Sequence, residues 1–93
     1  MIDGNVNEFA DMLSRGAELW FMFRGEKFFF QGWLEDSGIH VFVIEKESSD
    51  TNADYFWQTS SMSIEECAEA FFAAPIWDGQ TFWEAEHEMT WVD

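Results

Sequence analysis

Near the C-terminus, Glu84 and His87 have the spacing of a possible metal site. Three positions apart on a helix, they would share one face, as in carboxylate-bridged metal sites. Such sites need a second pair of this kind, and the only other histidine is His40. A zinc site formed by Cys67, His40 and His87 would have no local spacing motif to support it. We therefore predict neither a metal site nor a cofactor, and we interpret His87 as a surface residue.

Cys67 is the only cysteine in the chain, so it cannot form an intramolecular disulfide. A nucleophilic thiol needs a nearby base and positive surroundings. Instead, Cys67 is flanked by Glu65, Glu66 and Glu69, and it falls on the apolar stripe of a predicted helix. We interpret it as a core residue. A chain without disulfides is typical of a reducing compartment.

Adjacent acids such as Glu35-Asp36 are expected by chance in a chain with 19 acidic residues. General acid–base catalysis needs a cleft that separates the pKa values of two carboxyl groups. The sequence has no glycine-rich phosphate loop and no EF-hand motif. Residues 50–54 offer oxygen ligands for weak Ca²⁺ binding, but they lack the glycine and the terminal glutamate of such a loop. We predict no catalytic residues and no enzymatic activity.

Charge is the strongest compositional feature, because 19 acids and 4 bases give a formal net charge of −15. The four bases all lie in residues 1–46 with eight acids, whereas residues 47–93 hold eleven acids and neither Lys nor Arg. Nucleic-acid binding requires a basic footprint, which is missing here. Acidic surfaces also repel anionic lipid. The sequence therefore predicts neither direct nucleic-acid binding nor membrane binding, and it favours a basic protein partner.

The leading hypothesis is a small acidic, non-catalytic binding protein that occupies a basic site on its partner. In the extreme case it would mimic nucleic acid and inhibit a nuclease or another nucleic-acid-binding protein. Phage-encoded inhibitors of defence nucleases and immunity proteins have a similar size and charge, which is an analogy of composition alone. The acidic residues predicted to contact the partner are Glu65, Glu66, Glu69, Asp78, Glu84, Glu86 and Glu88.

Ninety-three residues predict one domain spanning 1–93. Eleven Phe and six Trp supply enough apolar surface for a core despite the strong charge. We find no basic segment followed by an apolar run at the N-terminus and no stretch of roughly 20 apolar residues. We therefore expect a cytoplasmic protein.

Residues 17–34 predict two strands joined at Gly25-Glu26, a pair suited to a type II′ turn. This turn would place Arg24 opposite Lys27. Because side chains alternate along a strand, one face would form the core. That face carries Leu19, Phe21, Phe23, Phe28, Phe30 and Leu34. The opposite face mixes polar groups with Trp20, Met22, Phe29 and Trp33.

The remaining elements follow from periodicity and capping signals. We expect a helix over 5–15 that ends at Gly16, and a strand over 39–45 that pairs Leu34 with Ile39. This pairing would place Ile39, Val41 and Val43 beside the core face of the hairpin. The expected elements in the second half are a strand at 55–60, capped helices at 63–74 and 82–88, and an irregular tail. The sequence thus predicts an α+β fold with an N-terminal helix, a three- to four-stranded antiparallel meander and two C-terminal helices.

The second face of the hairpin leaves two interpretations open. It could be covered by the apolar segments 6–13, 64–72 and 82–92, in which case it is purely structural. If no segment covers it, Trp20, Met22, Phe29 and Trp33 form a binding surface. The alternative function is therefore a homo-oligomeric or adaptor domain, with a homodimer as its simplest form.

Overall fold

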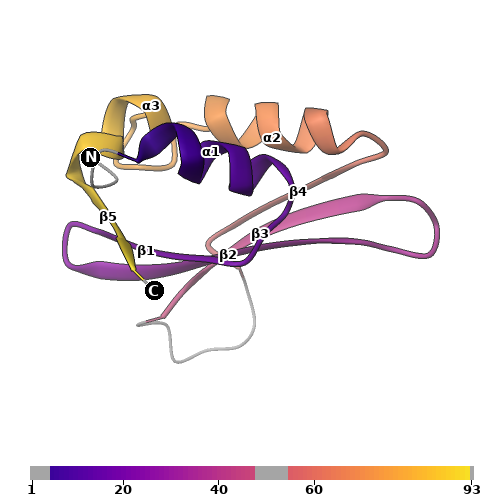
Figure 1. Ribbon diagram of the computed structural model, residues 1–93, viewed down its shortest axis with the longest axis horizontal. Coiled ribbons are helices and arrows are strands. Elements are labelled where there is room, and N and C mark those ends of the chain that lie inside the picture. Colours follow the sequence, from indigo (N-terminus) through magenta and orange to yellow (C-terminus); the bar gives the residue numbers. More distant parts are fainter. Residues whose placement is uncertain (1–4, 48–54, 93) are drawn as a thin grey trace.

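The computed structural model describes residues 5–47 and 55–92 and confirms an α+β fold, with helices packed on one face of an antiparallel sheet (Figure 1). In chain order the elements are α1 (Val6–Ser14), β1 (Leu19–Phe23), β2 (Glu26–Leu34), β3 (His40–Lys46), β4 (Trp57–Ser61), α2 (Ile64–Ala73), α3 (Phe82–Ala85), the 3-10 helix η1 (Glu86–Glu88) and β5 (Met89–Val92). None of the helices in these ranges is long and apolar enough to cross a membrane.

The sheet has five strands in the order β4-β3-β2-β1-β5. The expected three to four strands were too few, because the segment predicted as an irregular tail forms β5 along the free edge of β1. Met89 is buried on the core face and pairs with Phe23, while Trp91 packs its ring edge against Phe9. Met89 and Trp91 follow the two-residue period of a strand. A segment of four residues is too short for this period to be recognised in the sequence.

The first hairpin turns at Arg24-Gly25, so the predicted turn at Gly25-Glu26 was wrong. Both turn residues have positive φ, 49° and 80°, as a type I′ turn requires. Phe23 therefore pairs with Glu26, which moves the register by two residues from the prediction. Because side chains alternate with a period of two, this shift keeps each side chain on its predicted face. Five of the six predicted core residues are buried, but the prediction was wrong for Leu34, which ends β2 and is 60% exposed.

The pairing of β2 with β3 differs from the prediction by one residue, and this error reverses β3. Leu34 pairs with His40 rather than Ile39, because residues 36–38 form a three-residue loop that ends at Gly38, with φ 93°. Phe42 and Ile44 therefore lie in the core. Val41 and Val43, which the predicted pairing places on the core face, lie on the opposite face, although Val43 is buried there with 0% exposed surface.

The first two helix predictions are confirmed within one residue at each end, whereas the helix predicted over 82–88 is the α-helix α3 followed by the 3-10 helix η1. Helix α1 ends before Gly16, whose φ is 78°, but the Asn5 side chain makes no capping hydrogen bond. Ser63 caps α2 by accepting a hydrogen bond from the Glu66 backbone N–H, while the Glu66 carboxylate accepts from Ser61 instead of closing a capping box. Thr81 forms the complete predicted capping box of α3.

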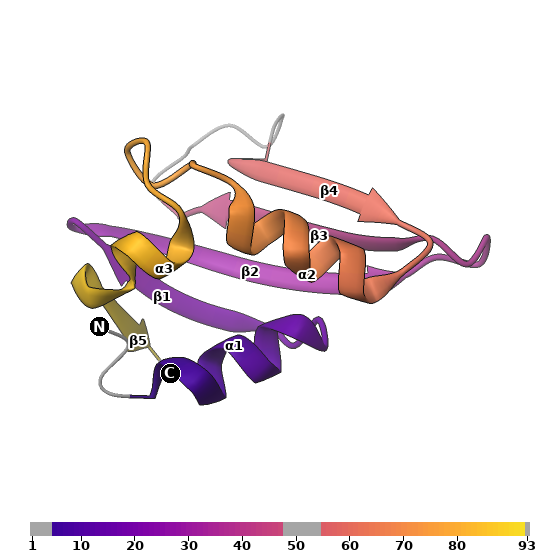
Figure 2. The same cartoon turned by 90° about the horizontal axis from the view of Figure 1, so that it is seen from above.

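All three α-helices lie on the same side of the sheet, with α2 over β3 and β4 and α1 beside α2 (Figure 2). Trp77, in the connection between α2 and α3, is only 1% exposed. Its ring lies 5.1–6.5 Å from the ring centroids of Phe21, Phe23, Phe28, Phe56 and Phe71. This connection therefore joins the helical layer to the sheet.

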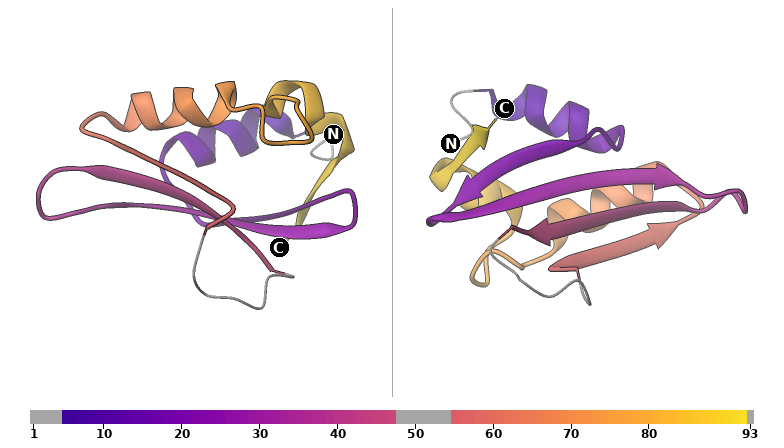
Figure 3. Two further views of the ribbon diagram at one scale, coloured as in Figure 1. Left: turned by 180° about the vertical axis from the view of Figure 1, so that it is seen from behind. Right: turned by 90° about the horizontal axis from the view of Figure 1, so that it is seen from below.

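The opposite face of the sheet has no helix against it in the described part of the chain (Figure 3, right). The apolar segments that could have covered it pack instead on the core face or, as β5, extend the sheet. We call this side the open face. Its side chains include Trp20, Met22, Phe29 and Trp33, as the alternation predicts, together with Val41 and Val43.

Gly32 of β2 lies opposite Phe42 of β3, and the Phe42 ring leaves no room for a side chain there. Gly32→Ala should therefore destabilise the fold. A Cβ atom at this position would lie 2.8 Å from the Phe42 ring and 3.0 Å from the Gly16 Cα. We expect a loss of about 1–3 kcal/mol in the free energy of unfolding, measured by urea denaturation. The loss should be smaller in a Phe42→Leu background, because a leucine has no ring at this position. An equal loss in both backgrounds would show that the Phe42 contact is not the cause.

Candidate functional site

The helical layer presents acidic side chains on its outer surface. Glu65, Glu66 and Glu69 are exposed on α2, the first two in the first turn, where the positive end of the helix dipole stabilises them. The Glu66 carboxylate also accepts a hydrogen bond from the Ser61 hydroxyl. No ion pair joins Glu65 or Glu69 to another described residue. These two carboxylates are therefore available to a partner.

The acids of the C-terminal segment are partly engaged within the protein. Arg24 donates from Nε and Nη2 to the two carboxylate oxygens of Glu88, both at 2.9 Å, and from Nη1 to Asp78 at 2.6 Å. The Glu84 carboxylate accepts a hydrogen bond from the Thr81 backbone N–H in the capping box. Of the predicted acidic residues, Asp78, Glu84 and Glu88 thus stabilise the fold as well as contributing charge.

The Arg24 pairs hold the hairpin turn against the C-terminal segment. They raise the pKa of the Arg24 guanidinium further above its usual range, and they lower the pKa of the Glu88 carboxyl. The hydrogen bonds are the main cause in both cases, because they favour the charged forms. Arg24 therefore binds two of the acids that the sequence assigns to partner binding, and its single positive charge offsets one of their two negative charges.

Each of the four basic residues is paired with an acid. Besides the Arg24 pairs, Arg15 lies 3.1 Å from Asp11, Lys27 lies 3.5 Å from Glu47, and Lys46 lies 3.9 Å from Glu26. Helices α2, α3 and η1 contain no Lys or Arg. The Lys and Arg residues therefore all lie in the end of α1, the first hairpin and β3, and Arg24 alone among them pairs with an acid of η1 in the described residues.

The open face brings together the four residues of the alternative site. Trp20 stacks on Phe29 with ring centroids 4.4 Å apart, and the Lys27 ammonium lies 4.9 Å from the centroid of the Trp20 ring. Met22 is the cross-strand partner of Lys27. Trp33 lies further along β2 and is 38% exposed. This surface combines aromatic rings with one cation, and it lies on the side of the sheet opposite the helices.

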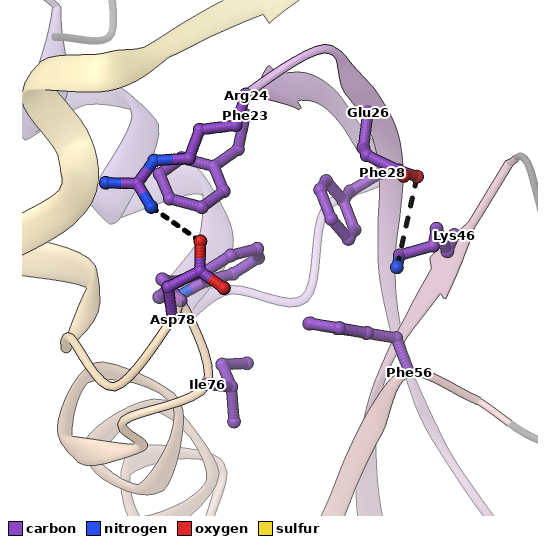
Figure 4. A pocket seen from close by; sticks show the side chains of 9 residues that line it. Phe23, Arg24, Glu26, Phe28, Lys46, Phe56, Ile76 and Asp78 are labelled. Carbon is purple, nitrogen blue, oxygen red and sulfur yellow. Dashed lines mark hydrogen bonds and ion pairs between the residues drawn. The ribbon is translucent and has the colours of Figure 1, made fainter.

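Sequence reasoning missed a cleft of about 270 Å³ between the hairpin turn, the start of β4 and the α2–α3 connection (Figure 4). Its lining residues are Phe23, Arg24, Glu26, Phe28, Lys46, Phe56, Ile76, Trp77 and Asp78. The lining comes from four separate parts of the chain, so no local pattern indicates it. The only sequence signal was the concentration of aromatic residues in 55–57 and at Trp77.

The polar atoms near this cleft are not all satisfied. The indole N–H of Trp77 and the Oε1 atom of Gln80 are buried without a hydrogen-bond partner among the described residues. The backbones of these two residues bond to each other at 3.1 Å in both directions. A buried polar group without a partner costs roughly 1–3 kcal/mol. This cost falls on the connection between α2 and α3, which contains both residues.

Cys67 is confirmed as a core residue, with 0% of its surface exposed. Its Sγ–H donates to the His40 carbonyl at 3.4 Å. Burial raises the pKa of the thiol, and the nearby Glu66 raises it further. No three His, Cys, Asp or Glu side chains in residues 5–47 and 55–92 are grouped to hold a metal ion. The possible Ca²⁺ ligands at 50–54 lie outside the described residues.

Comparisons with known protein families, with curated proteins and with solved structures find no match for this chain. Its function must therefore be inferred from its own residues. Three surfaces are candidates: the acids of the helical layer, the aromatic open face and the cleft beside the hairpin turn.

The pairing of Arg24 with Glu88 predicts a specific pH dependence. Because the folded-state pKa of Glu88 lies below its unfolded value of 4.5, the pair contributes stability above that pH. The contribution is lost as the pH falls through the folded-state pKa. In Arg24→Gln, the Glu88 carboxyl should titrate closer to pH 4.5, as measured by NMR of the side-chain carboxyl carbon. Arg15→Gln, which removes an arginine paired with Asp11, should leave the Glu88 titration unchanged. An unchanged titration in Arg24→Gln would contradict the pairing.

Proposed function

We propose that this protein is a cytoplasmic, non-catalytic binding protein whose acidic helical layer occupies a basic site on a partner protein. The observation that supports this most directly is the separation of charge. All four Lys and Arg residues are paired with acids, and α2 and α3 contain acids but no Lys, Arg or His. Such a surface attracts a basic partner and accelerates its association.

The size and charge of the protein are compatible with mimicry of nucleic acid. The molecule measures 36 × 31 × 26 Å and has a formal net charge of −15. Duplex DNA carries one charge per about 1.7 Å of axis, or roughly 18 charges over 30 Å. A protein that binds nucleic acid through a basic groove, such as a nuclease, would therefore encounter a comparable charge density. Inhibition by occupying that groove is the simplest outcome of such binding.

The exposed carboxylates of α2 provide the test of this function. Glu65→Gln/Glu69→Gln removes two charges from the helical layer without breaking an observed pair. With partners captured from lysate and then purified, we expect association at 50 mM salt to slow by about 2- to 10-fold. The difference should vanish near 1 M salt, where the screening length falls to about 3 Å. Stopped-flow fluorescence measures both rates.

The matched control is Glu18→Gln/Asp36→Asn, which also removes two exposed acids but leaves the helical layer intact. It should slow association less than the α2 variant does. Equal slowing by both variants would show that only net charge matters. Partner binding that does not change between low and high salt would rule out the acidic layer as the binding surface.

The open face supports a second candidate function, association with another copy of the chain or with an apolar partner. The observation in its favour is that no helix in the described ranges covers Trp20, Met22, Phe29 and Trp33. Apolar association buries surface and depends weakly on salt. This distinguishes it from the acidic-layer proposal.

Sedimentation equilibrium tests the open face directly. If it mediates self-association, the average mass should rise with concentration at both low and high salt, and Trp33→Ser should weaken the association. Trp83→Ser makes the same change on the helical side, where Trp83 is 49% exposed, and should have no effect. A monomer at every accessible concentration would exclude the homo-oligomer.

A further inference from the structure

The cleft beside the hairpin turn combines an aromatic floor with carboxylates at its rim. Phe28 and Phe56 point toward the same hollow, with the Arg24–Asp78 pair on one side and the Lys46–Glu26 pair on the other (Figure 4). The rings of Phe28 and Phe56 lie 5.0 Å apart, and Trp77 packs against both of them. Phe56 is the exposed ring of this cluster, at 36%, and it lies between two carboxylates that are each paired with a base.

The protein already places its own cations against these rings. The Lys46 ammonium lies 5.4 Å from the centroid of Phe56 and 6.0 Å from that of Phe28. On the opposite wall, the Arg24 guanidinium lies 5.1 Å from the centroid of Phe23 while it pairs with Asp78. Both contacts are cation–π interactions, which attract a cation through the negative face of the ring. The cleft is therefore suited to positive side chains.

Of the two internal cations, Lys46 is the more weakly held. Its ammonium lies 3.9 Å from Glu26, and the two side chains are 36% and 40% exposed. Exposed pairs of this kind contribute little to stability. Arg24, by contrast, is held by hydrogen bonds of 2.6–2.9 Å. A cation arriving from outside would therefore displace Lys46 and leave Arg24 in place.

We propose that the cleft receives an arginine side chain from the basic partner, which replaces Lys46 over Phe56 and Phe28 and pairs with Glu26. This deepens the proposed function and rests on it, because the net charge of −15 is what selects a basic partner. Arginine fits better than lysine, because its planar guanidinium stacks on rings and is more weakly hydrated. A cleft of about 270 Å³ admits one side chain rather than a larger ligand. Arginine is also enriched among the anchoring residues of protein interfaces.

The test uses N-acetyl-arginine-methylamide as the probe, with no partner protein. Citrulline in the same blocked form is the neutral analogue, and blocked lysine tests the choice of cation. Titration is followed by the NMR signals of the Trp77 indole N–H and the Phe56 amide. We expect saturable shifts with arginine in the millimolar range, weaker shifts with lysine and none with citrulline. Equal responses to arginine and citrulline would overturn the proposal.

Two pairs of variants separate the cleft from general attraction to an acidic protein. Phe56→Leu keeps the net charge and should weaken arginine binding by about 2- to 5-fold. Tyr55→Leu changes the neighbouring aromatic, which is similarly exposed but does not line the cleft, and should bind as the wild type does. Equal binding by Phe56→Leu and the wild type would overturn the proposal.

The second pair removes one lysine from each side of the sheet. Lys46→Met should tighten arginine binding by about 2- to 5-fold relative to Lys27→Met, because only Lys46 occupies the cleft. Both variants change the net charge equally, so equal affinities would contradict the displacement of Lys46. Because no partner is present, failure of the cleft is distinguishable from failure of the acidic layer. The acidic layer fails only if association with the partner does not depend on salt or on Glu65 and Glu69.

Discussion

The packing of Trp77 among aromatic rings from the sheet and from α2 is the contact on which the rest of the structure depends. Its side chain is 1% exposed and contacts aromatic rings from β1, β2 and α2 and that of Phe56, which directly precedes β4. It belongs to no helix, and it lies in the connection between α2 and α3. Burial of large rings supplies most of the apolar surface in a domain of this size. Because Trp77 lies where the layers meet, the same packing positions the helices on the sheet and forms the floor of the cleft.

Charge is organised around this core in two different ways. On the hairpin side, Arg24 is bound to Asp78 and Glu88, so it joins the first turn of the sheet to the C-terminal segment. On α2, Glu65 and Glu69 have no such partner among the described residues. A chain with 19 acids and 4 bases can neutralise only a few of its carboxylates. Arg24, Lys27 and Lys46 join separate elements, whereas Arg15 pairs with Asp11 at the end of α1. Glu65 and Glu69 on α2 are part of the negative charge that these bases do not offset.

The comparison of the two hairpins shows why some register errors matter and others do not. The predicted turn of the first hairpin was displaced, but the displacement moved the pairing by two residues, and Phe21 and Phe28 remained in the core. The error at the second hairpin was one residue, which exchanged Phe42 and Ile44 for Val41 and Val43. Strand β3 has apolar side chains on both faces, so alternation alone could not show which face lies in the core. The three-residue loop ending at Gly38 sets the register that places Phe42 in the core, and Gly32 leaves room for the Phe42 ring.

The sequence by itself determined the fold class, the helices and their principal caps, the two faces of the first hairpin and the excess of acids in the second half. These depend on periodicity, capping and composition, which are local properties. Only the tertiary structure decided that β5 completes the sheet, that no helix in the described ranges covers the open face, and that Arg24 binds two of the predicted partner-binding acids. The cleft is of the same kind, because Phe56 and Asp78 meet Arg24 and Lys46 only when distant segments pack together. Contacts between such segments depend on how whole layers fit against each other, and no short stretch of residues contains that information.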